Sequence, residues 1–426
     1  MSLETHISGA EDKLIDSLTF AGRNNASFVT ERRNCSFQPQ SGGLFSPNGI
    51  RLIRFNLADQ TGWLQGDTVR LVFTIQNLSA QPLVPICDSP NGMIRRLRVI
   101  CNGSAIVEDV EEYGGVSQMF ANLLPSARRY NDIRESWGAT TDAASLSQPF
   151  VADPIPAGAS RTVVVHLLSS VLSQGKALPL NMLPLVLELE VGDMNVAFAG
   201  EANNWTISRP RLIADVMTLD QSLQNSYAKH VLEGSSIPIM MHGLYSLKAT
   251  ITDNTQFSLP INRGFSRLST VYWSFIGPDA AGKEVNTFFH PLNIRTDPAD
   301  AASPLVPVTA ATDTFSWNIT VGSDRYPQFD CDSVGESFHR LRMAQLVHQG
   351  SDSFSISSSQ YRSDKAIFAC SFEKAPGQAS HTGINTRSGS QVCLNFKNVG
   401  AARQVHVVLH YEVALTISSA GCEVLD

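Results

Sequence analysis

The sequence predicts an all-β protein made of two consecutive β-sandwich domains, with a short helical connector between them. Turn-forming residues are frequent, with 21 Pro and 29 Gly, and this favours short strands over long helices. Runs of alternating apolar and polar residues occur on both sides of residues 204–234, where the spacing changes from that of a strand to that of a helix. Each half of the 426-residue chain is long enough to bury a core of its own.

The central stretch, residues 204–234, predicts one strand followed by one helix. In its first half four apolar residues alternate with polar ones: Trp205, Ile207, Leu212 and Val216. Pro210 in this run predicts an edge strand or a bulge, because proline has no N–H to donate to a sheet. In the second half five residues share one helical face: Leu219, Leu223, Tyr227, Val231 and Leu232. Asp220 is suited to cap this helix and Gly234 to end it, so we expect a helical connector over residues 220–234.

The first half is expected to hold an N-terminal arm over residues 1–43 and a β domain over residues 44–219. The arm is polar and weakly periodic, and such segments usually become ordered only against a neighbour. Alternation predicts strands in five places: residues 50–57, 67–77, 93–107, 161–168 and 185–191. The third of these folds back at Asn102-Gly103, a strong hairpin signal. Residues 110–124 have helical spacing, and the polar residues 125–148 predict an excursion that reaches outward from one end of the domain.

The second half follows the same order in a β domain over residues 235–418, with a tail over residues 419–426. Its predicted strands are residues 237–251, 257–261, 268–276, 314–327 and 405–417. A loop rich in Asp, Pro and Ala spans residues 277–314, and helical spacing predicts a helix over residues 333–348. About eight strands with one long loop in each half fit a jelly roll better than a propeller or an immunoglobulin array. We therefore predict two consecutive eight-stranded jelly-roll sandwiches, the helical connector and a few short helices in loops.

Composition argues against a nucleic-acid-binding role. Charged residues make up 17% of the chain, below the roughly 25% of an average soluble domain, so we expect less of the surface than usual to face solvent. With 32 basic and 39 acidic residues the net charge is −7, which disfavours a broad phosphate-binding surface. Arg95, Arg96 and Arg98 lie in one predicted strand without interleaved aromatic residues, which is typical of a solvent-facing or subunit-facing strand. We expect no direct sequence-specific binding of nucleic acid.

The cysteines and the hydropathy pattern favour a soluble intracellular product. The seven cysteines are an odd number without a C-x-x-C pair, which indicates free thiols in a reducing compartment rather than a disulfide framework. The N-terminus lacks the layout of a signal peptide. The most apolar tract, residues 178–191, is too short to span a bilayer and contains Glu188 and Glu190, so no membrane insertion is expected.

No motif for catalysis, cofactor binding or metal binding is complete. Residues 277–283 have the G-x-x-x-x-G-K spacing of a phosphate-binding loop, but Glu284 replaces the required hydroxyl, so a surface turn is expected. His406 and His410 share a strand face about 13 Å apart, too far to chelate one metal ion. Asp324, Asp330 and Asp332 lack the pattern of a calcium loop and predict a solvated loop. Residues 350–353 do not form a nucleophile elbow. We therefore name no catalytic, cofactor-binding or metal-binding residue, and calcium at subunit interfaces is left open.

Several tracts resemble one family of viral proteins. They are residues 178–191, 207–216, 319–327 followed by Glu336 and Leu341, 368–374, 382–386 and the final strand to Ile417. These tracts are similar to the double jelly-roll major capsid proteins of double-stranded DNA viruses, in the assemblage of virophages, polinton-like viruses and nucleocytoplasmic large DNA viruses. The resemblance covers roughly residues 50–420 as a succession of short matches in order.

The resemblance implies a structural protein without catalytic residues. Such a protein forms homotrimers with a pseudo-hexagonal outline, which contact neighbouring capsomers, and we expect penton and minor capsid proteins as further partners. Copies tile the icosahedral capsid of a virion that is assembled inside the host cell. The alternative is a carbohydrate-binding or glycan-processing β-sandwich protein. It would need an exposed aromatic platform or paired carboxylates, whereas Trp205, Trp273 and Trp317 are expected in core strands.

Overall fold

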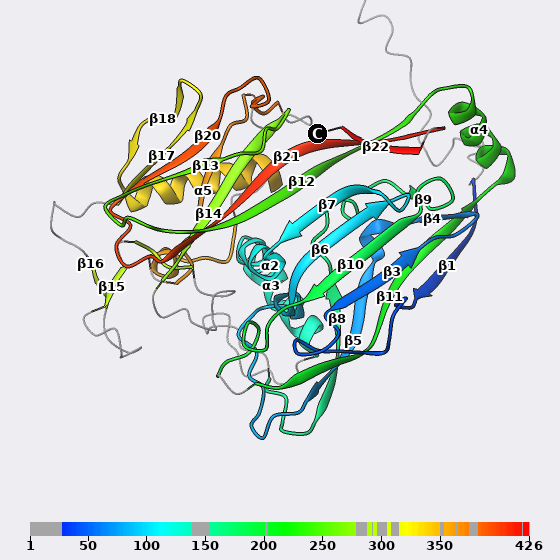
Figure 1. Ribbon diagram of the computed structural model, residues 1–426, viewed down its shortest axis with the longest axis horizontal. Coiled ribbons are helices and arrows are strands. Elements are labelled where there is room, and N and C mark those ends of the chain that lie inside the picture. The colour runs from blue at the N-terminus through cyan, green and yellow to red at the C-terminus, as the bar shows by residue number, and fades with distance from the viewer. Residues whose placement is uncertain are drawn as a thin grey trace, which may run out of the picture.

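The structure is a computed structural model. It describes residues 28–138, 153–200, 203–277, 288–291, 293–295, 305–307, 315–349, 353–362, 364–374, 382–419 and 421–425. Within these ranges the chain forms two β-sandwiches that lie next to each other (Figure 1).

The first sandwich is formed by a seven-stranded and a four-stranded sheet. The strands of the larger sheet are β1 (Val29–Phe37), β2 (Leu44–Phe45), β4 (Gly62–Leu64), β5 (Arg70–Asn77), β8 (Ser160–His166), β9 (Leu178–Pro179) and β11 (Trp205–Leu219). Their order is β8-β5-β11-β4-β9, and β1 and β2 also pair with β11. The strands of the smaller sheet, in the order in which they pair, are β3 (Leu52–Leu57), β10 (Leu185–Val191), β6 (Ile94–Cys101) and β7 (Ala105–Glu111).

The second sandwich is formed by a five-stranded and a four-stranded sheet. The strands of the larger sheet, in the order in which they pair, are β12 (Ile237–Thr250), β21 (Gln404–Ser418), β14 (Leu268–Ile276) and β19 (Phe368–Ser371), and β22 (Gly421–Leu425) pairs with β21. The strands of the smaller sheet are β13 (Gln256–Ile261), β20 (Val392–Lys397), β17 (Ser316–Val321) and β18 (Asp324–Cys331). A separate hairpin joins β15 (Asn293–Arg295) and β16 (Leu305–Pro307).

The predicted fold class of two jelly-roll sandwiches is confirmed. Apart from β1, β2, β9 and β22, each sandwich has eight strands. The strands β1 and β22 lie in segments that were expected to be an arm and a tail. β1 instead pairs with β11 of its own chain, and β22 pairs with β21, because both offer extended backbone next to a strand with free ladder groups. Residues 1–27 of the expected arm lie outside the described residues.

The connector has the predicted strand and helix. β11 leads into α4 (Gln221–Leu232), where the carboxylate of Asp220 accepts a hydrogen bond from the backbone N–H of Ser222. Gly234 follows the helix with a φ of +87°, a left-handed conformation that suits glycine at a helix end. Pro210 lies at a bulge, since the register with β5 shifts between Ser208 and Arg211. β11 is an interior strand, so the edge alternative for Pro210 is wrong and the bulge is right.

Helices fill the loops of both sandwiches. They are η2 (Gly66–Thr68), η3 (Pro90–Met93), α2 (Tyr113–Asn122), α3 (Ser126–Trp137), α5 (Val334–Gln349) and α6 (Ser358–Tyr361). α5 matches the helix predicted over residues 333–348. α3 occupies the first part of the polar excursion, which was not predicted to be helical, and residues 139–152 of that excursion lie outside the described residues. No helix within the described ranges is long and apolar enough to cross a membrane.

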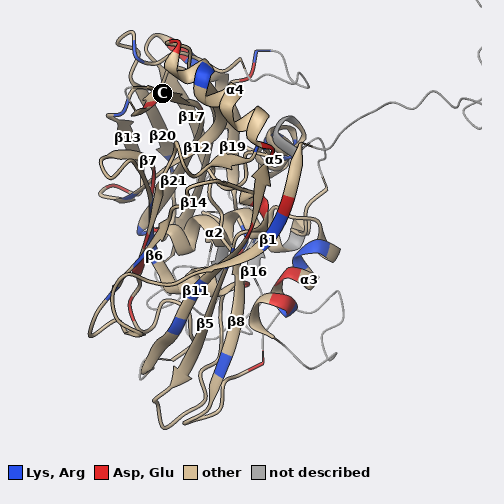
Figure 2. Ribbon diagram, turned by 90° about the vertical axis from the view of Figure 1, so that its right-hand side faces the viewer, with Lys and Arg blue, Asp and Glu red and all other residues tan. Residues whose placement is uncertain are grey.

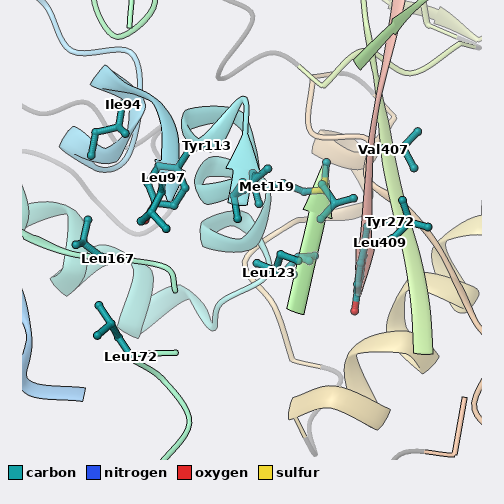
Figure 3. Packing of buried hydrophobic residues seen from close by; sticks show 14 of the residues in the cluster. Ile94, Leu97, Tyr113, Met119, Leu123, Leu167, Leu172, Tyr272, Val407 and Leu409 are labelled. Carbon is teal, nitrogen blue, oxygen red and sulfur yellow. The ribbon is translucent and has the colours of Figure 1, made fainter. Parts of the chain in front are cut away.

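The cores of the two sandwiches meet through α2. Figure 3 shows Met119 of this helix and Leu123, which follows its last residue, between Leu97 of β6 and Tyr272 and Leu409 of the second sandwich. These side chains are all almost completely buried. The ring of Phe120, also on α2, lies edge-on to the ring of Tyr272 at a centroid distance of 5.4 Å. Apolar burial is therefore continuous from one sandwich to the other, and this opposes independent movement of the two halves.

Candidate functional site

The contact between the two sandwiches is built from strand edges and two helices. β12 lies against β7, and the Ser246 hydroxyl donates a hydrogen bond to the carbonyl oxygen of Glu111. β12 and β21 extend across the first sandwich as far as α4 (Figure 1). The long strands of the second half thus form one wall of the junction.

A buried ion pair lies beside a second contact between the two sandwiches. Arg129 of α3 donates from Nε to Asp88 at 2.5 Å, and each side chain is only 6% exposed. Arg129 also donates from Nη1 to the hydroxyl of Ser355, which in turn donates to the carbonyl oxygen of Asn122. Ser355 belongs to the second half, so this network binds the segment before α6 to the helices of the first half.

A cavity of about 500 Å³ lies at the junction. Its described lining comes from both halves: Pro47, Asn48, Arg51, Glu112, Gly115, Asp193, Met194, Asn195, Val196, Lys248, Ile276 and His406. Arg51 is paired with Asp193 at 3.1 Å. None of these described residues carries a hydroxyl or a thiol, so the lining offers no side-chain nucleophile of that kind.

The two histidines that the sequence places on one face of β21 have different surroundings. His406 lines the cavity and lies close to Gly115, where a Cβ would be 3.1 Å from the imidazole ring. Burial, with a smaller contribution from the Lys248 ammonium group, lowers the pKa of His406 to about 4, so its imidazole is neutral at pH 7. The His410 ring instead stacks on the His242 ring at a centroid distance of 5.0 Å.

Of the three aspartates considered for calcium, Asp330 lies in an ion-pair cluster on a strand. The expected solvated loop is wrong for Asp324, the first residue of β18, and also for Asp330, which lies further along the same strand. Asp330 pairs with Arg325 and, at 3.0 Å, with Lys397, and its Oδ1 accepts a hydrogen bond from Asn318. Burial raises the pKa of Asp330, but the bonds from Lys397 and Asn318 outweigh this and hold the pKa below its ordinary value. These oxygens are already satisfied by protein cations and an amide.

The other candidate motifs contribute no site to the described structure. Residues 278–287, which include most of the phosphate-loop spacing, and residues 350–352 lie outside the described residues. Within the described part of the chain, no group of three or more His, Cys, Asp or Glu could hold a metal ion. All seven cysteines are free, and four of them are buried, in agreement with the predicted free thiols.

The arginines of β6 are neutralised by acidic residues on the neighbouring strands. Arg96 pairs with Asp109 at 2.6 Å, Arg98 pairs with Glu188 at 3.6 Å and Arg95 pairs with Glu190 at 3.8 Å. Figure 2 shows basic and acidic residues distributed together over several elements. The predicted interpretation of this strand as a solvated or subunit-facing surface is consistent with these pairs, because a phosphate would have to displace carboxylates.

Sequence reasoning missed an exposed apolar row on the second sandwich. Met240 of β12 is opposite Ala414 of β21, which is opposite Leu425 of β22, so the three side chains share one sheet face. Met240 is 51% exposed and Leu425 is 50% exposed. The sequence signal is the pair Met240-Met241, which places an apolar residue on each face of one strand.

All five tryptophans are buried, so no exposed Trp platform exists. The expectation that Trp205, Trp273 and Trp317 belong to the core is confirmed, since each is 0% exposed. The Trp273 and Trp317 rings meet edge to face at 4.7 Å, and the Trp273 ring stacks on the Phe368 ring at 5.7 Å. The face of a sandwich that would hold a sugar ring therefore has no indole to offer.

Comparison with known proteins establishes the fold. No family model matches the sequence, and no curated protein matches it. Similar solved structures include PBCV-1 VP54 fitted into a reconstruction of the virophage Sputnik (TM-score 0.62, 14% identity), the PBCV-1 virus capsid (0.61, 13%) and the Sputnik virophage (0.55, 12%). These matches cover 96%, 96% and 98% of this chain, and 100%, 100% and 93% of those chains.

The class defined by these observations is the double jelly roll, in which two β-sandwiches follow each other in one chain. More particularly, this chain has the double jelly-roll fold of the PBCV-1 and Sputnik virophage chains, and it matches them over almost its whole length. The fold implied by the sequence resemblance is therefore confirmed.

Proposed function

We propose that this chain is a major capsid protein that acts by self-assembly rather than by catalysis. Three copies form a pseudo-hexagonal capsomer from six jelly rolls, and capsomers tile an icosahedral shell. The observation that carries the proposal is the match over 96% of this chain to the whole length of a PBCV-1 virus capsid chain. A match confined to one sandwich would support only a shared domain.

The surface of the protein supports association between copies. Large apolar side chains are exposed on both sandwiches, including Leu52 in the first and Met240 and Leu425 in the second. Apolar surface of this kind gains free energy when a second protein covers it. A low charged fraction of 17% is in keeping with side faces that become buried in a shell.

The rigid junction also suits a shell protein. The continuous core through α2 and the hydrogen bond from Arg129 to Ser355 fix the two sandwiches relative to each other. A building block with a fixed shape presents the same edges to each neighbour, which a closed symmetric assembly requires. Penton and minor capsid proteins are further partners in this proposal, within a virion that is assembled in the host cell.

The oligomeric state of the purified protein tests the proposal. Light scattering after gel filtration should give three times the chain mass of 46.3 kDa, and electron microscopy should show three-fold particles with a hexagonal outline. Met240→Glu should weaken the trimer, whereas Met343→Glu, at an exposed residue of α5, should leave it intact. A monomer that binds glycans would refute the proposal in favour of the carbohydrate-binding alternative, which no exposed tryptophan supports.

A further inference from the structure

Two cysteines from opposite halves of the chain are neighbours in the fold. Cys101 ends β6 and is paired with Ala105 at the turn into β7, while Cys422 lies in β22 opposite Ile417 of β21. β22 contacts β7. β22 belongs to a sheet of the second sandwich, so this contact joins the two halves of the chain.

The residues next to each cysteine also show that the two segments are close. A Cβ added to Gly421 would lie 3.4 Å from Nδ2 of Asn102. Gly421 precedes Cys422 and Asn102 follows Cys101, so two consecutive positions of one segment lie against two consecutive positions of the other. The two thiols lie close enough to interact, and this interaction raises the pKa of Cys101 and lowers the pKa of Cys422.

We propose that Cys101 and Cys422 are a disulfide-forming pair that covalently joins the C-terminal strand to the first jelly roll under oxidising conditions. Both thiols are free in the structure, which is the reduced state. This inference does not depend on the proposed shell function, because it concerns one chain.

The reaction has a defined order because the two thiols differ in accessibility. Cys422 is partly exposed and Cys101 is buried, so the Cys422 thiolate attacks one sulfur of a small-molecule disulfide such as oxidised glutathione. This forms a mixed disulfide and releases one glutathione thiolate. Cys101 then loses its proton and attacks Sγ of Cys422, which releases the second glutathione. The two protein thiols are oxidised, and one glutathione disulfide is reduced to two thiols.

Peptide mapping tests the proposal on the full chain. The reduced protein is incubated with oxidised glutathione, alkylated and digested with trypsin without reductant. Trypsin yields residues 99–128 and 404–426, each with a single cysteine, so a linked pair of these peptides identifies the bond in a mass spectrum. The linked peptide should dominate over any link to Cys393, a partly buried thiol that serves as the internal reference.

Thermal unfolding gives a second readout. The cross-link closes a loop across most of the chain, so oxidation should raise the unfolding midpoint by about 5 °C, and reductant should reverse the shift. Cys422→Ser should abolish both the linked peptide and the shift, and Cys393→Ser should retain both. Capping of Cys422 by glutathione with Cys101 still free in the wild-type protein would overturn the proposal, and this outcome is visible even if a variant fails to fold.

Discussion

Replacing Arg129 by Met should destabilise the junction between the two sandwiches. The change keeps most of the side-chain volume but removes the cation that Nε presents to Asp88, and both side chains are only 6% exposed. A buried carboxylate that loses its counter-charge costs about 3–5 kcal/mol in free energy of unfolding. Lys365, whose ammonium group interacts with Asp88, partly compensates, so we expect the lower end, about 3 kcal/mol.

Thermal unfolding of the variants measures this effect, and a loss of about 3 kcal/mol should lower the midpoint of the 426-residue chain by about 3–4 °C. The adjacent Arg128 is the matched control, because its side chain is 68% exposed and pairs with Asp132 on the same helix. Arg128→Met should cost less than about 0.5 kcal/mol. Adding Asp88→Asn to Arg129→Met should recover part of the loss, since it removes the orphaned charge. A loss below about 1 kcal/mol for Arg129→Met, or no recovery in the double variant, would refute this reasoning.

Three further predictions concern the core, pH dependence and backbone strain. Trp273→Ala should lower the free energy of unfolding by about 3–5 kcal/mol in urea titrations, and a cost near zero would contradict its central place in the core. The pKa of His406 in the folded protein is about 4, below its ordinary 6.5, so the unfolded chain takes up a proton first as pH falls. The free energy of unfolding should therefore be about 2 kcal/mol lower at pH 5 than above pH 6.5. His406→Gln should flatten this pH dependence, and an unchanged dependence would contradict the role of His406. Arg209 has a φ of +52°, so Arg209→Gly should raise stability by up to about 1 kcal/mol, while Arg211→Gly in the same strand should lower it, and equal effects would argue against strain at the bulge.

The strands and helices that the sequence predicted correctly are those with one buried face. β11 alternates because its apolar side chains face the core, and α4 shows both its capping residue and its final glycine. The turn at Asn102-Gly103 has φ values of +48° and +74°, as its sequence predicts for a tight hairpin. In these places a local pattern and the final environment agree.

The elements that were missed lack such a pattern for physical reasons. α3 buries Arg129 and Ser136 together with Ile133 and Trp137, so polar residues occupy its inner face and hide the helical period. β1 is exposed along most of its length and therefore has no apolar alternation to detect. Asp330 was expected in a solvated loop because its surroundings lack the pattern of a calcium loop, and its partner Lys397 is distant in sequence. Contacts between distant segments decide all three cases.

The candidate site depended even more on such contacts. Cys101 and Cys422, the junction cavity and the buried network of Ser355 each combine residues from both halves of the chain. The spacing of residues within one strand or helix does not predict which distant residues lie next to each other. The sequence could exclude complete motifs, but it could not say which isolated residues meet.

The position of β7 restricts how copies of this chain can associate. β7 is the last strand of its sheet, and its open side is occupied by β12 and β22 of the same molecule. A bare outer strand is normally a template on which a foreign peptide can extend a sheet. Because β12 and β22 cover β7, another copy of the chain cannot add a strand to it by backbone hydrogen bonding, and fibres cannot grow from this edge. The edge therefore needs no charged residue or proline to prevent such pairing.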